Sequence, residues 1–305
     1  MRYIPLGATG LEVPVVAVGC MRINGLALMQ AEVFLKTALE LGMNFFDHAD
    51  IYGGGQCEEI FSAALGNTPR ERVILQSKCG IRPGRYDFSK EHILSSVDDI
   101  LSRLKTDYLD VLLLHRPDAL MEPDEIAEAF DQLHSTGKVR HFGVSNMNVM
   151  QMQLLQRSVR QPLAINQLQF GLGHALMVAQ GTHVNMHGND ACQRDGSVLD
   201  YCRLQNITVQ PWSPFQYRFD QNRGTFIGSD EFLELNQMLA ELAEKYGTDI
   251  TSLALAWILR HPANMQPIIG TMNLERLHSC AKAANITLSR EDWYALHLAA
   301  GHTLP

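Results

Sequence analysis

The chain has 305 residues, a formal net charge of −8 and 46% hydrophobic residues, which is typical of an ordinary soluble globular protein. No basic block is dense enough to bind nucleic acid, so we expect no such partner. No stretch approaches about 18 uninterrupted apolar residues and the N-terminus lacks a secretory pattern, so we expect no membrane span. Six separated cysteines without a C-x-x-C pair indicate reduced thiols and a cytoplasmic protein.

Residues 1–14 begin the chain with two short apolar segments around a Gly-Ala-Thr-Gly turn, which predicts a β-hairpin. After them, short apolar runs alternate with amphipathic segments of helical period. Eight runs predict strands: "VVAVGCM" (15–21), "MNFFDHA" (43–49), "RVILQSKC" (72–79), "YLDVLLLH" (108–115), "HFGVSN" (141–146), "LAINQLQF" (163–170), "ITVQPWSP" (207–214) and "MQPIIGT" (265–271).

The segments between these runs carry helix signals. Residues 30–41 place Val33 on an apolar face, and Gly42 follows as a natural stop. Ser89 is expected to cap a second helix, and Pro123 to begin a third.

Strands that alternate with helices predict an α/β protein with a parallel sheet. Eight repeats favour a (β/α)₈ TIM barrel, closed at the bottom by the hairpin, as one domain over residues 1–305. A doubly wound sheet is the alternative, but "GCMRING" (19–25) does not match the G-x-G-x-x-G spacing of that fold.

Polar residues close several of the predicted strands. Active sites of such barrels lie at the C-terminal ends of the strands. The second, third and fourth runs end near Asp47, Lys78 and His115, and Tyr52 follows in the next loop. A single lysine at a strand end usually has no special role, because its side chain simply extends its charged head into water. Four such residues at one end of three adjacent strands predict a shared pocket.

These residue types suggest proton donation by a tyrosine. A free tyrosine has a pKa of about 10, and a nearby ammonium lowers that value. Lys78 would be that cation, Asp47 would hold it in place, and His115 would hydrogen-bond the reacting oxygen. The set contains no obvious nucleophile, so it suits hydride transfer to a carbonyl carbon.

In their order and spacing, several motifs resemble those of the aldo-keto reductases, NADPH-dependent (β/α)₈ oxidoreductases, and of a bacterial subgroup in particular. The similarity runs from "PLGATGLEVPVVAVGCMR" to "PIIGTMNLERL" and includes "FFDHADIYGGG", "SKCG", "LLLHRPD", "GKVRHFGVSN", "NQLQF" and "PWSPF". It implies reduction of aldehydes or ketones, with hydride from the nicotinamide and a proton from Tyr52. It places the catalytic tetrad on Asp47, Tyr52, Lys78 and His115.

The same resemblance implies the contacts to NADP. Ser145, Asn146 and Gln167 would hold the nicotinamide carboxamide, Trp212 would stack on the ring, and Arg276 would meet the 2′-phosphate. The other expected cofactor residues are Met21, Ser213, Phe215, Gly270 and Thr271.

The phosphate end departs from the common family pattern. Gly270 stands where many members carry Lys, and Cys280 where an Asn often contacts adenine, which leaves the preference for NADPH over NADH open. Residues 224–228 are expected to fold over the pyrophosphate, and residues 171–195 to form a lid or binding loop.

The substrate is expected to be a small, uncharged carbonyl compound. This expectation rests on an apolar, aromatic pocket near Met21, Phe170, Trp212 and Phe215. Two other functions are considered. One is a cofactor-sensing binding module of the same fold. The other is a metal-dependent hydrolase using His48, Asp50 and His115, although no H-x-H motif is present and no metal ligand is expected.

Overall fold

The computed structural model describes residues 1–183, 197–217 and 224–302. Its centre is a closed parallel barrel in the strand order β10-β11-β12-β3-β4-β5-β8-β9. The predicted (β/α)₈ barrel is confirmed, and each of the eight apolar runs contributes one strand to it. The strands are β3 (Ala17–Gly19), β4 (Phe45–Asp47), β5 (Ile74–Cys79), β8 (Leu109–Leu114), β9 (Val139–Ser145), β10 (Leu163–Gln169), β11 (Thr208–Trp212) and β12 (Ile268–Ile269).

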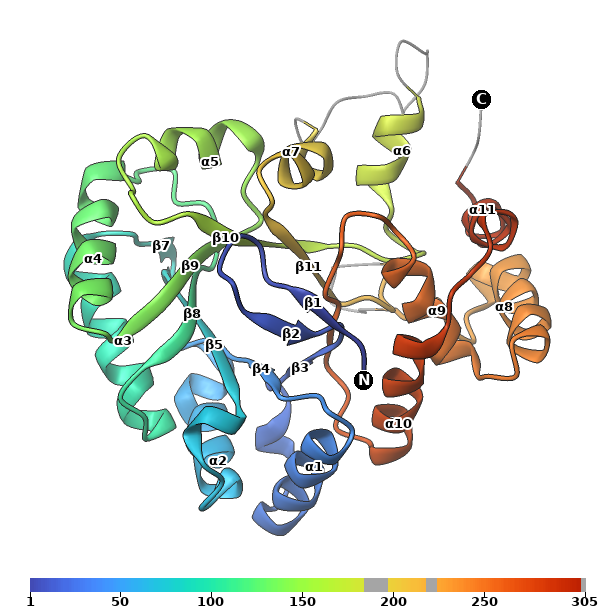
Figure 1. Ribbon diagram of the computed structural model, residues 1–305, viewed down its shortest axis with the longest axis horizontal. Helices are drawn as coiled ribbons and strands as arrows, with labels where there is room; N and C mark the ends of the chain where they lie inside the picture. The colour runs from blue at the N-terminus through green and yellow to red at the C-terminus, as the bar shows by residue number, and fades with distance from the viewer. Residues whose placement is uncertain (184–196, 218–223, 303–305) are drawn as a thin grey trace.

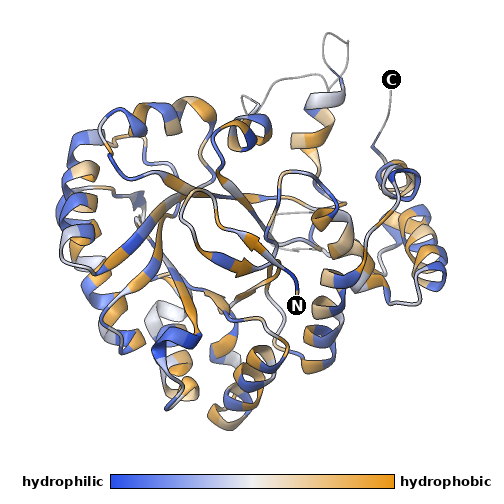
Figure 2. Ribbon diagram, viewed as in Figure 1, coloured by the Kyte–Doolittle hydropathy of each residue, from blue (hydrophilic) through white to orange (hydrophobic). Residues whose placement is uncertain are grey.

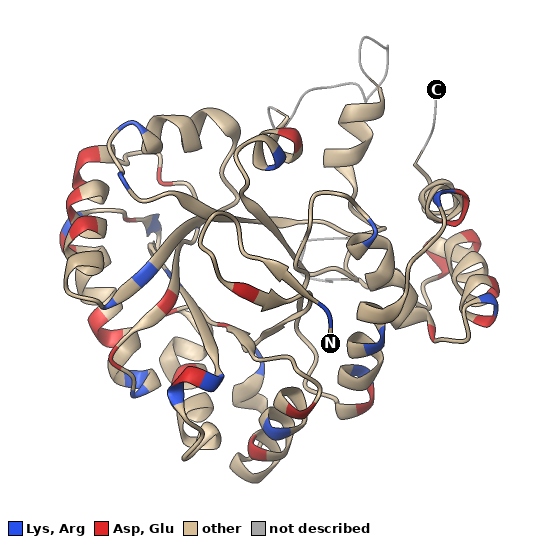
Figure 3. Cartoon of the chain, viewed as in Figure 1, with Lys and Arg blue, Asp and Glu red and all other residues tan. Residues whose placement is uncertain are grey.

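Helices surround the barrel, as Figure 1 shows. Their apolar faces turn toward the strands in Figure 2, and the charged residues in Figure 3 gather on the outer surfaces. The helices are α1 (Leu28–Glu40), α2 (Gln56–Leu65), α3 (Lys90–Leu104), α4 (Pro123–Ser135), α5 (Val149–Gln156), α6 (Leu176–Thr182), α7 (Val198–Leu204), α8 (Leu233–Lys245), α9 (Ile250–Leu259), α10 (Leu274–Lys282) and α11 (Arg290–Ala299). No helix within the described ranges is long and apolar enough to cross a membrane.

The helix signals in the sequence are partly confirmed. Pro123 begins α4, and Gly42 follows α1 with a φ of 78°, a conformation that favours glycine. The expectation that Val33 lies on the buried face of α1 is wrong, because this residue is 48% exposed. Ser89 does stand at the N-cap of α3, but its hydroxyl donates to Asp87 and caps no backbone N–H of the helix.

The N-terminal hairpin closes the bottom of the barrel. Strands β1 (Tyr3–Pro5) and β2 (Glu12–Pro14) pair antiparallel and lie across the barrel opening in Figure 1. The Gly7 N–H donates to Thr208 Oγ1 at 2.7 Å, where β11 begins. Gln266, which precedes β12, donates to the Pro14 carbonyl at 2.7 Å. Both contacts lie at the N-terminal ends of barrel strands, as the sequence predicted.

The excursion after β10 is only partly described. Gly171 and His174 form an antiparallel bridge, and α6 follows. The remainder of the expected lid, residues 184–195, lies outside the described residues, so its role stays a prediction. Five cysteines in the described ranges are buried free thiols.

Candidate active site

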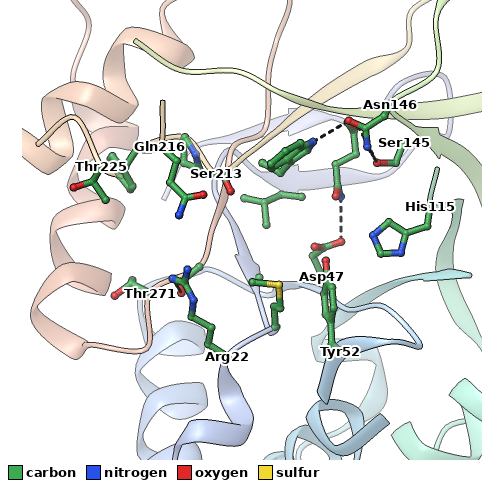
Figure 4. Close-up of a pocket in the computed structure, with 18 of the residues that line it drawn as sticks. Arg22, Asp47, Tyr52, His115, Ser145, Asn146, Ser213, Gln216, Thr225 and Thr271 are labelled. Atoms are coloured by element: carbon green, nitrogen blue, oxygen red, sulfur yellow. Dashed lines mark hydrogen bonds between the residues drawn. The ribbon is translucent and has the colours of Figure 1, made fainter. Parts of the chain in front are cut away.

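The structure brings Asp47, Tyr52, Lys78 and His115 together at the C-terminal end of the barrel. Asp47 ends β4, Lys78 belongs to β5, and His115 follows β8, while Tyr52 begins the short 3₁₀ helix η2 (Tyr52–Gly55). Lys78 Nζ donates to Asp47 Oδ1 at 2.7 Å and to Tyr52 Oη at 3.3 Å. Figure 4 shows the Tyr52, Asp47 and His115 side chains facing one cavity.

Lys78 keeps its charge although its side chain is fully buried. Burial alone would lower the pKa of the ammonium. The Asp47 carboxylate and the Tyr52 hydroxyl outweigh that effect and raise the pKa above its ordinary value. The His48 carbonyl accepts a further hydrogen bond from Nζ at 2.7 Å. These partners favour the charged ammonium, which lies beside the Tyr52 hydroxyl.

The pKa of Tyr52 shifts in the direction opposite to the one expected from sequence. Burial raises it above the ordinary value of 10, and the nearby Lys78 ammonium lowers it by less than burial raises it. The expectation considered only the cation and omitted the low-dielectric surroundings of the phenol. Tyr52 is consequently fully protonated near neutral pH, which is the form that a proton donor requires.

His115 is held neutral beside this cation. Burial lowers the pKa of its imidazole well below the ordinary value, and the charges of Lys78 and Arg116 act in the same direction. Its ring meets the Tyr52 ring edge-on at a centroid distance of 6.0 Å. Nδ1 is buried and has no hydrogen-bond partner among the described residues. A neutral imidazole keeps one N–H, so His115 can donate a hydrogen bond to an oxygen in the cavity.

Residues at and just after the ends of β9 and β11 form the adjoining wall. Asn146 Nδ2 donates to Ser145 Oγ at 2.7 Å, and Trp212 Nε1 donates to Asn146 Oδ1 at 3.3 Å. Asn146 and Ser213 have positive φ angles of 59° and 49°. Such conformations are strained for residues other than glycine and concentrate at functional sites. Asn146 and Ser213 directly follow β9 and β11 and present polar side chains to the same cavity, as Figure 4 shows.

A cavity of about 710 Å³ runs from this wall toward α10. All ten residues expected to contact the cofactor line it: Met21, Ser145, Asn146, Gln167, Trp212, Ser213, Phe215, Gly270, Thr271 and Arg276. Thr225 and Ile227, from the segment expected to cover a pyrophosphate, line it as well. Phe170 does not. The prediction that it faces the pocket is wrong, because it is 1% exposed and stacks on Trp257 at 5.3 Å.

The far end of the cavity carries positive charge. Asn273 caps α10 by accepting the Arg276 N–H at 3.0 Å, and the Arg276 side chain lines the cavity. Arg22, which sequence reasoning passed over, donates from Nη1 to the Gly270 carbonyl at 3.3 Å. A Cβ added to Gly270 would lie 3.8 Å from that same Nη1. The Arg22 guanidinium thus lies beside the position where a longer side chain at residue 270 would begin.

Comparison with known proteins identifies the family. Residues 15–299 match the model of the "Aldo/keto reductase family". The chain belongs to this family. It is 38% identical over 286 residues to oxidoreductase YdhF of Escherichia coli (strain K12), covering 89% of this chain and 88% of that protein. It is 32% identical to a 6-dehydroglucose reductase of Agrobacterium fabrum, covering 90% and 88%.

Solved structures give the same result. The crystal structure of an aldo/keto reductase from Klebsiella pneumoniae with NADP and acetate has a TM-score of 0.77 and 25% identity, covering 98% of this chain and 95% of that one. The crystal structure of a Klebsiella pneumoniae aldo-keto reductase with NADPH has a TM-score of 0.78 and 25% identity. The match covers 100% of this chain and 97% of that one.

The geometry of this aldo/keto reductase does not favour the metal-hydrolase alternative. His48 is fully buried and packs edge-on against Phe61 at 4.5 Å, and burial, then Lys78, lower its pKa to about 3. Neither His48 nor Asp50 lines the cavity that His115 faces. Across the described ranges, no group of three His, Cys, Asp or Glu side chains is placed to hold a metal ion.

Three glutamines of this aldo/keto reductase were also missed. Gln76, Gln210 and Gln266 are fully buried inside the barrel, where apolar residues are the rule. A signal for the first was available, since Gln76 and Lys78 are two residues apart on one strand and so share a face. Amide side chains within otherwise apolar runs could have marked the other two.

Proposed function

We propose that the protein is an NADPH-dependent reductase that converts aldehydes or ketones to alcohols, with Tyr52 as the proton donor. The single observation that carries this proposal is the 3.3 Å contact between the buried Lys78 ammonium and the Tyr52 hydroxyl at the wall of the cavity. Family membership and the NADP-containing relatives support the cofactor.

The residues of the cavity fit a nicotinamide dinucleotide. Ser145, Asn146 and Gln167 present amide and hydroxyl groups suited to a carboxamide, and the Trp212 indole offers a flat surface for the ring. The N-terminus of α10 and the guanidinium of Arg276 suit phosphate groups. When bound there, NADPH supplies the hydride that reduces the carbonyl carbon.

The protein's own residues account for the proton. A carbonyl oxygen between Tyr52 and His115 would accept a hydrogen bond from each, which stabilises the negative charge that develops on it. Tyr52 then gives its proton to that oxygen, and Lys78 stabilises the resulting phenolate. Asp47 keeps Lys78 in place throughout. A positioned general acid contributes about 10²- to 10⁴-fold to such a rate.

The choice of test substrates follows from the cavity and from the relatives. Met21, Ile51 and Trp212 give it an apolar part, while His115 and Arg116 add polar groups at the candidate catalytic end. Two relatives that are 32% and 33% identical, from Agrobacterium fabrum and Novosphingobium aromaticivorans, are named 6-dehydroglucose reductases. A substrate panel should therefore contain aromatic aldehydes, simple ketones and polyhydroxylated aldehydes.

Replacement of Tyr52 by Phe tests the proposal directly. The ring remains and the proton is lost, so we expect kcat to fall by about 10²- to 10⁴-fold. The dissociation constant for NADPH, measured by fluorescence titration, should stay within about twofold, a change of only about 0.4 kcal/mol. The Tyr294→Phe variant, altered in α11 outside the cavity, is the matched control. Retained turnover by Tyr52→Phe would refute the role of Tyr52, and a wild-type protein that binds no NADPH would refute the reductase proposal.

A further inference from the structure

Four buried glutamines form a continuous hydrogen-bonded chain through the barrel. Gln76 comes from β5, Gln167 from β10 and Gln210 from β11, while Gln266 lies two residues before β12. Their exposed fractions are 0%, 3%, 0% and 0%, respectively. Buried amides are costly unless they are hydrogen-bonded, so an interior set of this size requires partners.

This series of hydrogen bonds starts at the bottom of the barrel and ends on the carboxylate of Asp47. Gln266 Nε2 donates to the Pro14 carbonyl at 2.7 Å, and Gln210 Nε2 donates to Gln266 Oε1 at 2.8 Å. Gln210 Oε1 accepts from Gln76 Nε2 at 2.8 Å and from Gln167 Nε2 at 3.2 Å. The same two nitrogens donate to Asp47 Oδ1, at 2.6 Å and 3.2 Å.

The direction of each amide follows from its neighbour. The Pro14 carbonyl can only accept, so Gln266 must turn its Nε2 toward it and its Oε1 toward Gln210. Gln210 must then present Nε2 to Gln266, which leaves Oε1 for the amides of Gln76 and Gln167. Those two must present Nε2, and this is the group that Asp47 needs. A backbone carbonyl at the barrel bottom thereby sets which atom of Gln76 faces the carboxylate.

Asp47 Oδ1 consequently accepts from three nitrogens: Lys78 Nζ, Gln76 Nε2 and Gln167 Nε2. Hydrogen bonds to an ionised acceptor are short and strong, and in a water-free interior they offset the cost of the buried charge. The two amides approach from β5 and β10, which fixes the direction in which the carboxylate faces. A carboxylate that faced elsewhere would no longer hold Lys78 against Tyr52.

We propose that Gln76 and Gln210 are positioning residues for proton donation, acting through Asp47 and Lys78 and touching neither substrate nor Tyr52. Gln76 holds the carboxylate directly, and Gln210 acts one step further away by fixing the amide of Gln76. The inference rests on the proposed reductase function, because the step that it affects is proton donation by Tyr52.

A kinetic cycle between Gln210→Met and Asp47→Asn tests the inference. Met is close to Gln in size but can neither accept from Gln76 nor donate to Gln266. In the wild-type background, Gln210→Met should lower kcat by about tenfold, within the range that small misplacements of reacting groups produce, with a nearly unchanged KM for the carbonyl compound. In the Asp47→Asn background the same change should alter kcat by less than about twofold, because residues that act through one group are not additive.

Two further variants separate positioning from packing. Gln76→Met should behave like Gln210→Met, and the double variant should be no slower than Gln76→Met alone. Asn166→Leu is the matched control, since Asn166 is a buried amide on β10 that donates to the Met147 carbonyl and lies outside the chain of glutamines. It should leave kcat unchanged in both backgrounds. Equal losses of kcat from Gln210→Met in the wild-type and Asp47→Asn backgrounds would overturn the inference, as would no loss in either.

A stability cycle gives an answer that does not require reductase activity. The urea midpoint should fall more on Gln76→Met in the wild-type background than in the Asp47→Asn background, because only the former presents a buried charge to the amide. Equal shifts in both would overturn the inference. A wild-type protein that reduces no carbonyl compound would defeat the proposed function, while this cycle would still decide whether the glutamine chain serves Asp47. If Gln210→Met does not fold, the Gln76→Met pair decides the question alone.

Discussion

Arg22 is the residue whose importance the structure changes most. It follows the end of β3 and lies between Tyr52 and Thr271 in Figure 4, whereas Arg276 belongs to the first turn of α10. The Gly270 carbonyl accepts one of its N–H groups at 3.3 Å, which holds the guanidinium at the cavity wall. The Arg22 guanidinium beside Gly270 suits the pyrophosphate shared by NADPH and NADH, while Arg276 at the start of α10 suits the 2′-phosphate that only NADPH carries.

Substitution of the two arginines should therefore give different cofactor profiles. Arg22→Leu should weaken the binding of NADPH and of NADH by the same factor, about tenfold or more. A hydrogen bond to a charged group contributes about 1.5–3 kcal/mol. Arg276→Leu should weaken the binding of NADPH and leave the affinity for NADH nearly unchanged. Fluorescence titration of each variant with both cofactors measures this. If Arg22→Leu affected NADPH alone, the guanidinium would belong to the 2′-phosphate site instead.

Asp50 should make stability depend on pH. Burial, and then the charge of Glu58, raise its pKa from 3.8 to about 7. Between these values the folded protein binds a proton that the unfolded chain lacks, so the stabilising contribution present at low pH is lost as pH rises through about 7. Asp50→Asn removes the ionisation. The unfolding free energy of this variant relative to wild type should therefore be higher at pH 8 than at pH 5, by up to about 3 kcal/mol.

Urea unfolding at the two pH values checks this, with Asp87→Asn as the matched control. Although burial acts in the opposite direction, hydrogen bonds from Ser89 and Arg82 lower the pKa of Asp87 to about 2. Asp87 is thus ionised at both pH values, and its replacement should have the same effect at each. A pH-independent effect of Asp50→Asn would contradict the raised pKa.

The site residues differ in how far the sequence predicts them. Tyr52, Lys78 and His115 could be placed in one pocket because strand ends of a parallel barrel meet at one rim. The direction of the Tyr52 pKa shift could not be predicted, because burial raises the pKa and the lysine charge lowers it. Which effect is larger depends on how deeply the hydroxyl is buried and how far it lies from Lys78. Arg22 gave no signal because it meets Gly270 across 248 residues of sequence.

At the scale of elements, apolar runs located all eight barrel strands, since strands buried on both faces read as continuous apolar segments. Helix faces were predicted less well. In α1 the buried residues are Ala31, Phe34, Leu35 and Ala38, so the core stripe excludes Val33. A β-branched apolar residue at the edge of the stripe looks the same in sequence whether it faces the barrel or water.

Close packing of β9 against its neighbours makes Gly143 hard to replace. A Cβ added there would lie 2.7 Å from the Ile165 carbonyl oxygen of β10 and 2.7 Å from a methyl group of Leu113 on β8. Gly143→Ala should lower the free energy of unfolding by about 1–3 kcal/mol, the usual cost of overpacking. Gly181→Ala in α6 is the opposite control, because nothing lies within 4 Å of its added Cβ and alanine favours a helix by up to about 1 kcal/mol. Chemical denaturation compares the two, and equal effects would contradict the contact at Gly143.

At the scale of the whole molecule, the hairpin and the cavity occupy opposite ends of the barrel. Ile4 and Val13 of the hairpin strands and Leu6 of its turn are buried, so the hairpin contributes to the common core although it lies outside the ring of strands. The hydrogen bonds to Thr208 and from Gln266 connect it to the last strands of the chain. The buried apolar residues form one cluster in space, whose members range along the sequence from Ile4 to Leu296. This single core favours the prediction that the chain folds as one domain.

Leu6→Ala tests that prediction. The Leu6 side chain is fully buried in the hairpin, at the opposite end of the barrel from the candidate catalytic residues. Loss of a buried leucine costs about 2–5 kcal/mol, so the midpoint of unfolding should fall clearly while kcat at 25 °C stays near that of wild type. Circular dichroism and the fluorescence of the three tryptophans, of which Trp212 lines the cavity, should report one coincident transition in both proteins. A hairpin or cavity region that unfolded separately would split the two signals, and the variant would then shift only one of them.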